Sequence, residues 1–147
     1  MAVQHVVAVD LGAGSGRVMD VQFDGTRLEL NQLYRFSNYP VQVTNTLYWD
    51  VLNMWKHIQT GLSKRPKDVL SIGVDTWGAD IAMLDKNGQL LANPVHYRDA
   101  DRADAVDWVL ERIPRREVYD RTGIHFMPFN TLYLLGAWLR CDSPLLD

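Results

Sequence analysis

An acidic residue followed by a glycine-rich turn is the first place where this sequence could do chemistry. The apolar run Val6–Val9 has the composition of a strand, and it leads into Asp10 and the turn Gly12–Gly16. A carboxylate can hold a hydrated divalent cation, and glycines let backbone N–H groups surround an anion without interference from a Cβ. The pattern therefore predicts a phosphate site.

The residues after the turn narrow the class of phosphate fold. Met19, Val21 and Phe23 recur with the period of two that is typical of a strand, and Asp24-Gly25 is typical of a hairpin turn into a third strand. The glycine loop thus joins strand to strand, whereas the Walker loop and the dinucleotide fingerprint both open a helix. Arg17 also stands where the last glycine of the dinucleotide pattern would be. A plain flexible turn between two structural strands remains the alternative.

A second strand that ends in an acid repeats this logic. Residues 69–74 predict a strand that leads into Asp75-Thr76-Trp77-Gly78, then a strand over 81–84 and a hairpin turn at Asn87-Gly88. Two such strands can lie side by side, with Asp10 and Asp75 at the same edge. Trp77 offers an apolar plate to a small ligand, and Gly78 allows close approach to the backbone. The alternative is a tryptophan folded back onto the core.

A third polar cluster follows Pro94. Tyr97, Arg98 and Asp99 combine a ring, donors and acceptors in a predicted loop, which suits a polyhydroxylated ligand. The neighbouring His96 is more often a structural histidine than a catalyst.

Helices and loops must position these groups. The spacing predicts a helix after the N-cap Asp50, with an apolar stripe that places Met54 and Trp55 in the core and leaves His57 solvated. Residues 38–45 read as a polar loop. Further helices are expected from an N-cap at Asp101, between Pro114 and Gly123, and after an N-cap at Asn130.

Length and composition set the class of protein. The 147 residues predict one compact core, and 18 acidic against 15 basic side chains argue against a nucleic-acid partner bound through a basic face. The single cysteine, Cys141, excludes an internal disulfide. Without a signal-peptide pattern or an apolar run of membrane-spanning length, we expect a cytoplasmic protein and no membrane partner.

These motifs carry a family resemblance. The chain resembles the N-terminal part of the FGGY family of carbohydrate kinases, most of all its members that phosphorylate L-rhamnulose. The stretches that match are collinear and span nearly the whole chain. They are residues 7–13 with 15–17, Asp75-Thr76-Trp77-Gly78 with Asp80, Tyr97-Arg98-Asp99, and 123–133 around Phe129-Asn130-Thr131-Leu132-Tyr133.

The resemblance implies an α/β fold of the actin-like ATPase (ribonuclease-H-like) type, a mixed sheet with helices on both sides, as the first of two such domains. It assigns the ATP phosphates to Ala13, Gly14, Ser15, Gly16 and Arg17, and water-mediated magnesium to Asp10. Gly14 stands where the family more often has serine, which removes one hydroxyl beside the phosphate. A ketose would lie near the substrate-binding residues Gly78, Trp77, Tyr97, Arg98, Asp99 and Asn130.

The expected activity is ATP-dependent phosphorylation of L-rhamnulose to the 1-phosphate. The family's catalytic aspartate and adenosine site belong to a C-terminal domain beyond residue 147, so we expect the 147-residue chain alone to be inactive. Three alternatives remain. They are a kinase of another ketose such as L-fuculose or L-xylulose, a noncatalytic sugar- or nucleotide-binding module, and a nuclease on the same fold that holds two metals with Asp10, Asp75 and a third acid.

Overall fold

The chain divides into two compact units rather than the single core that its length predicts. The computed structural model describes residues 2–100 and 103–146. The first unit comprises the described residues through Tyr39 together with Asp50–Gly78, and the second comprises Pro40–Trp49 and the described residues from Ala79 onward. Each unit is considered separately below.

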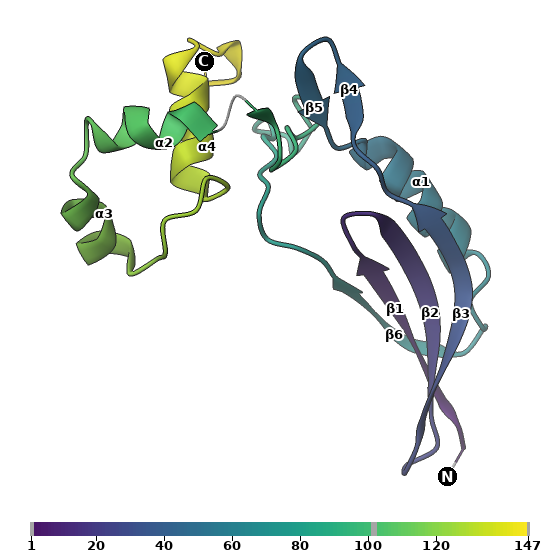
Figure 1. The fold of residues 1–147 in the computed structure, drawn as a ribbon. Helices are drawn as coiled ribbons and strands as arrows, with labels where there is room; N and C mark the ends of the chain where they lie inside the picture. The colour runs from purple at the N-terminus through teal and green to yellow at the C-terminus, as the bar shows by residue number, and fades with distance from the viewer. Residues whose placement is uncertain (1, 101–102, 147) are drawn as a thin grey trace. The chain divides into compact units, whose positions relative to one another are not determined.

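A four-stranded sheet forms the framework of the first unit (Figure 1). Its strands are β1 (Gln4–Leu11), β2 (Ser15–Phe23), β3 (Leu28–Ser37) and β6 (Val69–Asp75), in the spatial order β3-β2-β1-β6. β1 pairs antiparallel with β2 and parallel with β6, so the sheet is mixed, as predicted. The glycine turn does join strand to strand.

Helix α1 (Val51–Leu62) packs against this sheet, and the start of the helix was predicted correctly. The Asp50 carboxylate accepts a hydrogen bond from the Asn53 N–H at 3.0 Å, which satisfies one of the free donors of the first turn. The core joins three buried valines of β1 and β2 to the inner face of the helix; its members include Val7, Val9, Val18, Ile58 and Leu62.

Two predictions about α1 were wrong. Trp55 is 56% exposed, because Ile58 and Leu62 are the residues of α1 that pack on the valines, and Trp55 lies outside their face of the helix. His57 is not simply solvated: its ring stacks on Phe36 at 4.8 Å, and its Nδ1 lies 2.9 Å from the Tyr34 hydroxyl.

The second unit holds the remaining elements. Residues 38–45, predicted as a loop, contain β4 (Val41–Val43), which pairs with β5 (Thr46–Tyr48) in a small hairpin. The helices are α2 (Ala103–Leu110), α3 (Arg115–Thr122) and α4 (Thr131–Arg140), followed by the 3-10 turn η2 (Pro144–Leu146). As predicted, α3 lies between Pro114 and Gly123, whose φ of 62° ends the helix. The predicted cap at Asp101 lies outside the described residues.

The strand predicted over 81–84 does not form as a strand. A single antiparallel bridge joins Leu84 to Leu90 across the turn at Asn87-Gly88. The Asp85 carboxylate accepts hydrogen bonds from the N–H groups of Asn87 and Gln89, both at 2.8 Å. These local side-chain bonds stabilise the predicted turn, while residues 81–84 make only the one bridge.

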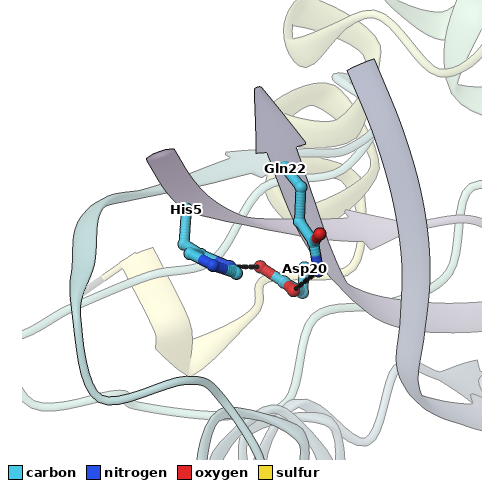
Figure 2. A network of polar contacts seen from close by, with 3 residues as sticks. All are labelled: His5, Asp20 and Gln22. Atoms are coloured by element: carbon cyan, nitrogen blue, oxygen red, sulfur yellow. Dashed lines mark hydrogen bonds and ion pairs between the residues drawn. The ribbon is translucent and has the colours of Figure 1, made fainter. Parts of the chain in front are cut away.

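The sheet also carries a polar network at the end of β1 and β2 away from the glycine turn. Figure 2 shows Asp20 between His5 and Gln22, with the His5 Nδ1 and the Gln22 Nε2 each 2.8 Å from a carboxylate oxygen. Burial alone would raise the pKa of the Asp20 carboxyl. The hydrogen bonds from Gln22 and His5, with the charge of His5, outweigh burial and hold that pKa below its ordinary value.

Candidate phosphate and sugar sites

The backbone of the turn between β1 and β2 is held in place by Asn38. Asn38, buried at the end of β3, donates from its side chain to the Gly12 carbonyl at 2.9 Å and from its backbone to the Gly14 carbonyl at 3.2 Å. Within the described part of the chain, the N–H groups of Ala13 and Gly14 donate to no acceptor. Carbonyls turned into the protein leave these donors for a ligand, as in other anion-binding turns.

Four charged residues form a row across the sheet beside this turn. In the strand register Arg35 lies opposite Arg17, Arg17 opposite Asp10, and Asp10 opposite Asp75. Directly paired residues share a face of a sheet, so the row runs Arg–Arg–Asp–Asp on one face. The prediction that Asp10 and Asp75 lie at the same edge is confirmed.

One ion pair joins the two middle residues of the row, Arg17 and Asp10. The Arg17 Nη2 lies 2.5 Å from the Asp10 Oδ2, with side chains 47% and 38% exposed. Arg35 Nη2 lies 3.5 Å from the Ser15 hydroxyl oxygen, a long contact. Gly16, by contrast, is buried beneath Phe36, and a Cβ there would lie 2.2 Å from the ring, so packing requires glycine at this position.

A hollow of about 590 Å³ opens beside the turn. It is lined by Gly14, Ser15 and Arg35 with Phe36, Ser37 and Tyr39. A Cβ built on Gly14 would meet only the Tyr39 ring, at 3.8 Å, so the turn at this point presents backbone rather than side chain. The residues that line the hollow thus include the cation Arg35, the hydroxyl of Ser15 and Gly14 with its open N–H group.

These residues fit a triphosphate with its magnesium ion. Arg17, Arg35 and the turn N–H groups suit phosphate oxygens, while Asp10 and Asp75 suit the metal. Magnesium held by one or two carboxylates keeps several waters, which agrees with water-mediated contact to Asp10. When bound, the ion would neutralise phosphate charge; the chain's own residues position it.

Trp77 and Gly78, the first predicted sugar contacts, follow β6 at the end of the first unit. Trp77 is partly buried, and Gly78 is exposed. A Cβ built on Gly78 meets no atom within 4 Å, so the backbone there is open to close approach.

An aromatic cluster in the second unit contains Tyr97. Its ring stacks on buried His96 at 4.5 Å and meets Phe129 edge-on at 6.4 Å, while Trp49 lies 4.2 Å from His96. The Arg98 guanidinium lies 5.0 Å from the Tyr97 ring, and the Arg98 N–H donates to the His96 Nδ1 at 3.0 Å. His96 thus has the structural role expected, because it fixes the loop that presents Tyr97 and Arg98.

Asp99 and Asn130, the other predicted sugar contacts, have structural partners, and so does the neighbouring Asp80. Asp99 is buried, and its Oδ2 accepts from the Leu47 N–H at 2.7 Å, which ties the loop to β5. Asp80 accepts from the Trp49 indole at 2.7 Å. Asn130 is the N-cap residue of α4, but its side chain makes no cap bond and donates to the His125 carbonyl at 2.6 Å.

A cavity of about 370 Å³ lies within the second unit. Ile81, Met83, Leu134 and Trp138 give it an apolar wall, and Asp99 and Asn93 add polar atoms. The buried Asn93 Oδ1 has no hydrogen-bond partner in the described residues. Asp99 is the only predicted sugar contact that lines this cavity.

The structure therefore brings the phosphate residues together in the first unit and Tyr97, Arg98 and Asp99 together in the second. Sequence reasoning missed Asn38 and Arg35. A signal for Asn38 existed, since a short amide side chain just after a strand and before Pro40 is typical of a residue that bonds turn backbone. Arg35 carried no signal, because its position depends on strand register.

In the part of the chain that the structure describes, no helix is long and apolar enough to cross a membrane.

Comparison of sequences places the chain among known proteins. The profile described as "FGGY family of carbohydrate kinases, N-terminal domain" matches residues 5–146. A rhamnulokinase of Pectobacterium atrosepticum is 44% identical over 98% of this chain, and one of Bacteroides thetaiotaomicron is 42% identical over 98%. The chain spans 30% of the length of each of these relatives.

Comparison of structures supports the fold. A gluconate kinase from Lactobacillus acidophilus aligns with a TM-score of 0.79 and 14% identity, over 98% of this chain and 30% of that one. A xylulose kinase from the same species aligns with a TM-score of 0.77 and 15% identity, over 97% and 29%. The fold is thus the α/β actin-like ATPase fold, as expected. Because the family profile matches nearly the whole of the chain, the chain belongs to the FGGY family of carbohydrate kinases.

Proposed function

We propose that this chain is the N-terminal part of a kinase that transfers the γ-phosphate of MgATP to the terminal hydroxyl of L-rhamnulose, giving the 1-phosphate. The observation that carries the proposal is the Arg–Arg–Asp–Asp row beside an open glycine turn. The sugar is argued from the relatives at 42–44% identity, which are rhamnulokinases.

In this proposal the chain binds and orients but does not complete the reaction. The turn N–H groups of Ala13 and Gly14, with Arg17, hold phosphate oxygens, and Asp10 holds the hydrated magnesium ion. Arg17 is paired with Asp10, so the approach of phosphate and metal replaces their direct contact with contacts to the ligand. Phosphoryl transfer needs the acceptor hydroxyl held in line with the γ-phosphate by both walls of a cleft, and a C-terminal domain supplies the second wall.

Each unit offers its own candidate sugar contacts. In the first unit, Gly78 gives open backbone and Trp77 gives an apolar surface. In the second unit, Tyr97 and Arg98 give a ring and a donor, and His96 holds them. Asp99 and Asn130 already bond backbone groups of their own unit, so we assign them to shaping the site rather than to direct sugar contact.

The test is ADP release with MgATP and a panel of L-rhamnulose, L-fuculose, L-xylulose and L-ribulose. It is run on the full-length protein and on the 147-residue chain in parallel. Preference for L-rhamnulose by the full-length protein, with no turnover by the short chain, is the expected result. Preference for another ketose would overturn the sugar assignment and leave the kinase activity supported. Steady turnover by the short chain would refute the proposal that it binds the substrates but does not complete the reaction.

Gly78→Val probes the sugar site alone. The open space around Gly78 lets valine fit without strain in the unit that contains it, so the variant should fold. We expect loss of ketose binding with MgATP affinity changed by less than about twofold. An equal loss of both affinities would refute a sugar-specific role.

A noncatalytic binding module remains a second candidate for the chain as it stands, because it spans only 30% of its rhamnulokinase relatives. Calorimetric titration of the 147-residue chain with MgATP and with L-rhamnulose tests it. Silence toward both ligands would remove it.

A further inference from the structure

We infer that Arg35 is a second phosphate-binding residue, which forms one anion site with Arg17 at the adjoining ends of β2 and β3. The inference rests on the proposed function only in naming the triphosphate of ATP as the anion. The site itself is argued from strand register, charge and the hollow beside the glycine turn.

Strand register places two positive charges together. Arg17 and Arg35 are directly opposite each other in the antiparallel pair β2–β3, where Cβ atoms lie about 4.5–5.5 Å apart. Like charges directly opposite destabilise a sheet, and a polyanion between them converts that repulsion into attraction. The arrangement therefore costs stability in the free chain and favours a bound anion.

The partners of the two arginines differ. Arg17 pairs with Asp10, whereas no carboxylate among the described residues lies within ion-pair distance of Arg35. Arg116 and Arg121 of α3 are paired like Arg17, each with an acid four residues away. Of the two arginines that face each other across β2 and β3, Arg35 is therefore the one that no described carboxylate neutralises.

The hollow places Arg35 next to the other anion donors. Arg35 lines it with Gly14 and Ser15, and its Nη2 is 3.5 Å from the Ser15 hydroxyl. The open N–H group of Gly14 lies on the same turn. A guanidinium has five N–H donors in a planar fork, so Arg35 can bind phosphate oxygens in two-point fashion beside the turn.

The experiment titrates the 147-residue chain with tripolyphosphate and with MgATP in a calorimeter. Arg35→Gln is compared with Arg27→Gln, which removes the same charge from an exposed arginine at the opposite end of the β2–β3 pair. We expect Arg35→Gln to weaken tripolyphosphate binding about tenfold and Arg27→Gln to change it less than about twofold. Arg35→Lys should restore only part of the affinity, because an ammonium lacks the fork.

A melting curve separates binding from a structural role. Without anion, Arg35→Gln should melt at the wild-type temperature or slightly above it, since the repulsion from Arg17 is removed. It should also lose most of the rise in melting temperature that tripolyphosphate gives the wild type. A lower melting temperature without anion would identify a structural residue and overturn the inference.

The outcomes distinguish this inference from the proposed function. Unchanged affinity in Arg35→Gln, with MgATP bound by the wild type, overturns the inference and leaves the kinase proposal intact. Tripolyphosphate binding that needs Arg35, without any binding of MgATP, supports the anion site and counts against nucleotide binding. Equal losses in the two glutamine variants, or a wild type silent to both ligands, overturn the inference.

Discussion

Gly16→Ala should destabilise the first unit because the phosphate turn is built against an aromatic stack. A Cβ on Gly16 would lie 2.2, 2.6 and 2.7 Å from three carbons of the Phe36 ring, where ordinary contacts begin at 3.4 Å. The ring must therefore retreat by at least about 1 Å. Phe36 is 6% exposed and stacks on His57 with an interplanar angle of 7°, so the shift passes to α1.

The expected loss of unfolding free energy follows from these contacts. Overpacking a core position costs about 1–3 kcal/mol. Replacing glycine by alanine also restricts the unfolded chain, which returns about 0.4–1 kcal/mol. The net prediction for Gly16→Ala is a loss of up to about 2.5 kcal/mol. Gly14→Ala is the matched control, since its Cβ would meet only Tyr39 at 3.8 Å.

The assay is urea unfolding followed by far-ultraviolet circular dichroism, with hydrogen exchange of β2 and β3 amides as a local measure of the first unit. Gly16→Ala should lower both the midpoint and the protection, and Phe36→Leu in the same chain should recover part of the loss by making room. If Gly16→Ala matches Gly14→Ala in both measurements, the packing argument is refuted.

Four further predictions follow. Tyr133→Phe should leave stability unchanged or raise it by up to about 1 kcal/mol, because the buried Tyr133 hydroxyl has no hydrogen-bond partner within the described residues; thermal melting checks this. The lowered pKa of Asp20 gives stability that is present at neutral pH and lost as pH falls below about 4, so Asp20→Asn should reduce this part of the acid sensitivity in urea titrations at several pH values. Gly14→Ser has room beside Tyr39 and should bind MgATP several-fold tighter at unchanged stability; weaker binding in a calorimeter would contradict the hydroxyl argument. Asn38→Ala frees the Gly12 carbonyl and should lower both stability and tripolyphosphate affinity, and a loss of neither would show that Asn38 does not hold the turn.

Much of the first unit could be predicted because its signals are local. The valines of β1, the glycine turn and the Asp50 cap each depend on residues only a few positions apart in the sequence, and all three were predicted. Where non-local packing competes, local signals failed. Trp55 fits the apolar stripe of α1 yet lies outside the core, and residues 81–84 form an apolar run typical of a strand but make only one bridge.

The sequence by itself determined the chemistry of the phosphate turn, the strand-to-strand connection and the family. Tertiary structure decided which charges meet, because β1, β2, β3 and β6 are separate in the chain and only their register aligns Asp10, Arg17, Arg35 and Asp75. It also decided that Gly16 packs directly against the Phe36 ring, whereas Gly14 has room for a side chain. The physical reason is common to both: a pairing register or an interatomic contact depends on residues distant in sequence, which no local pattern encodes.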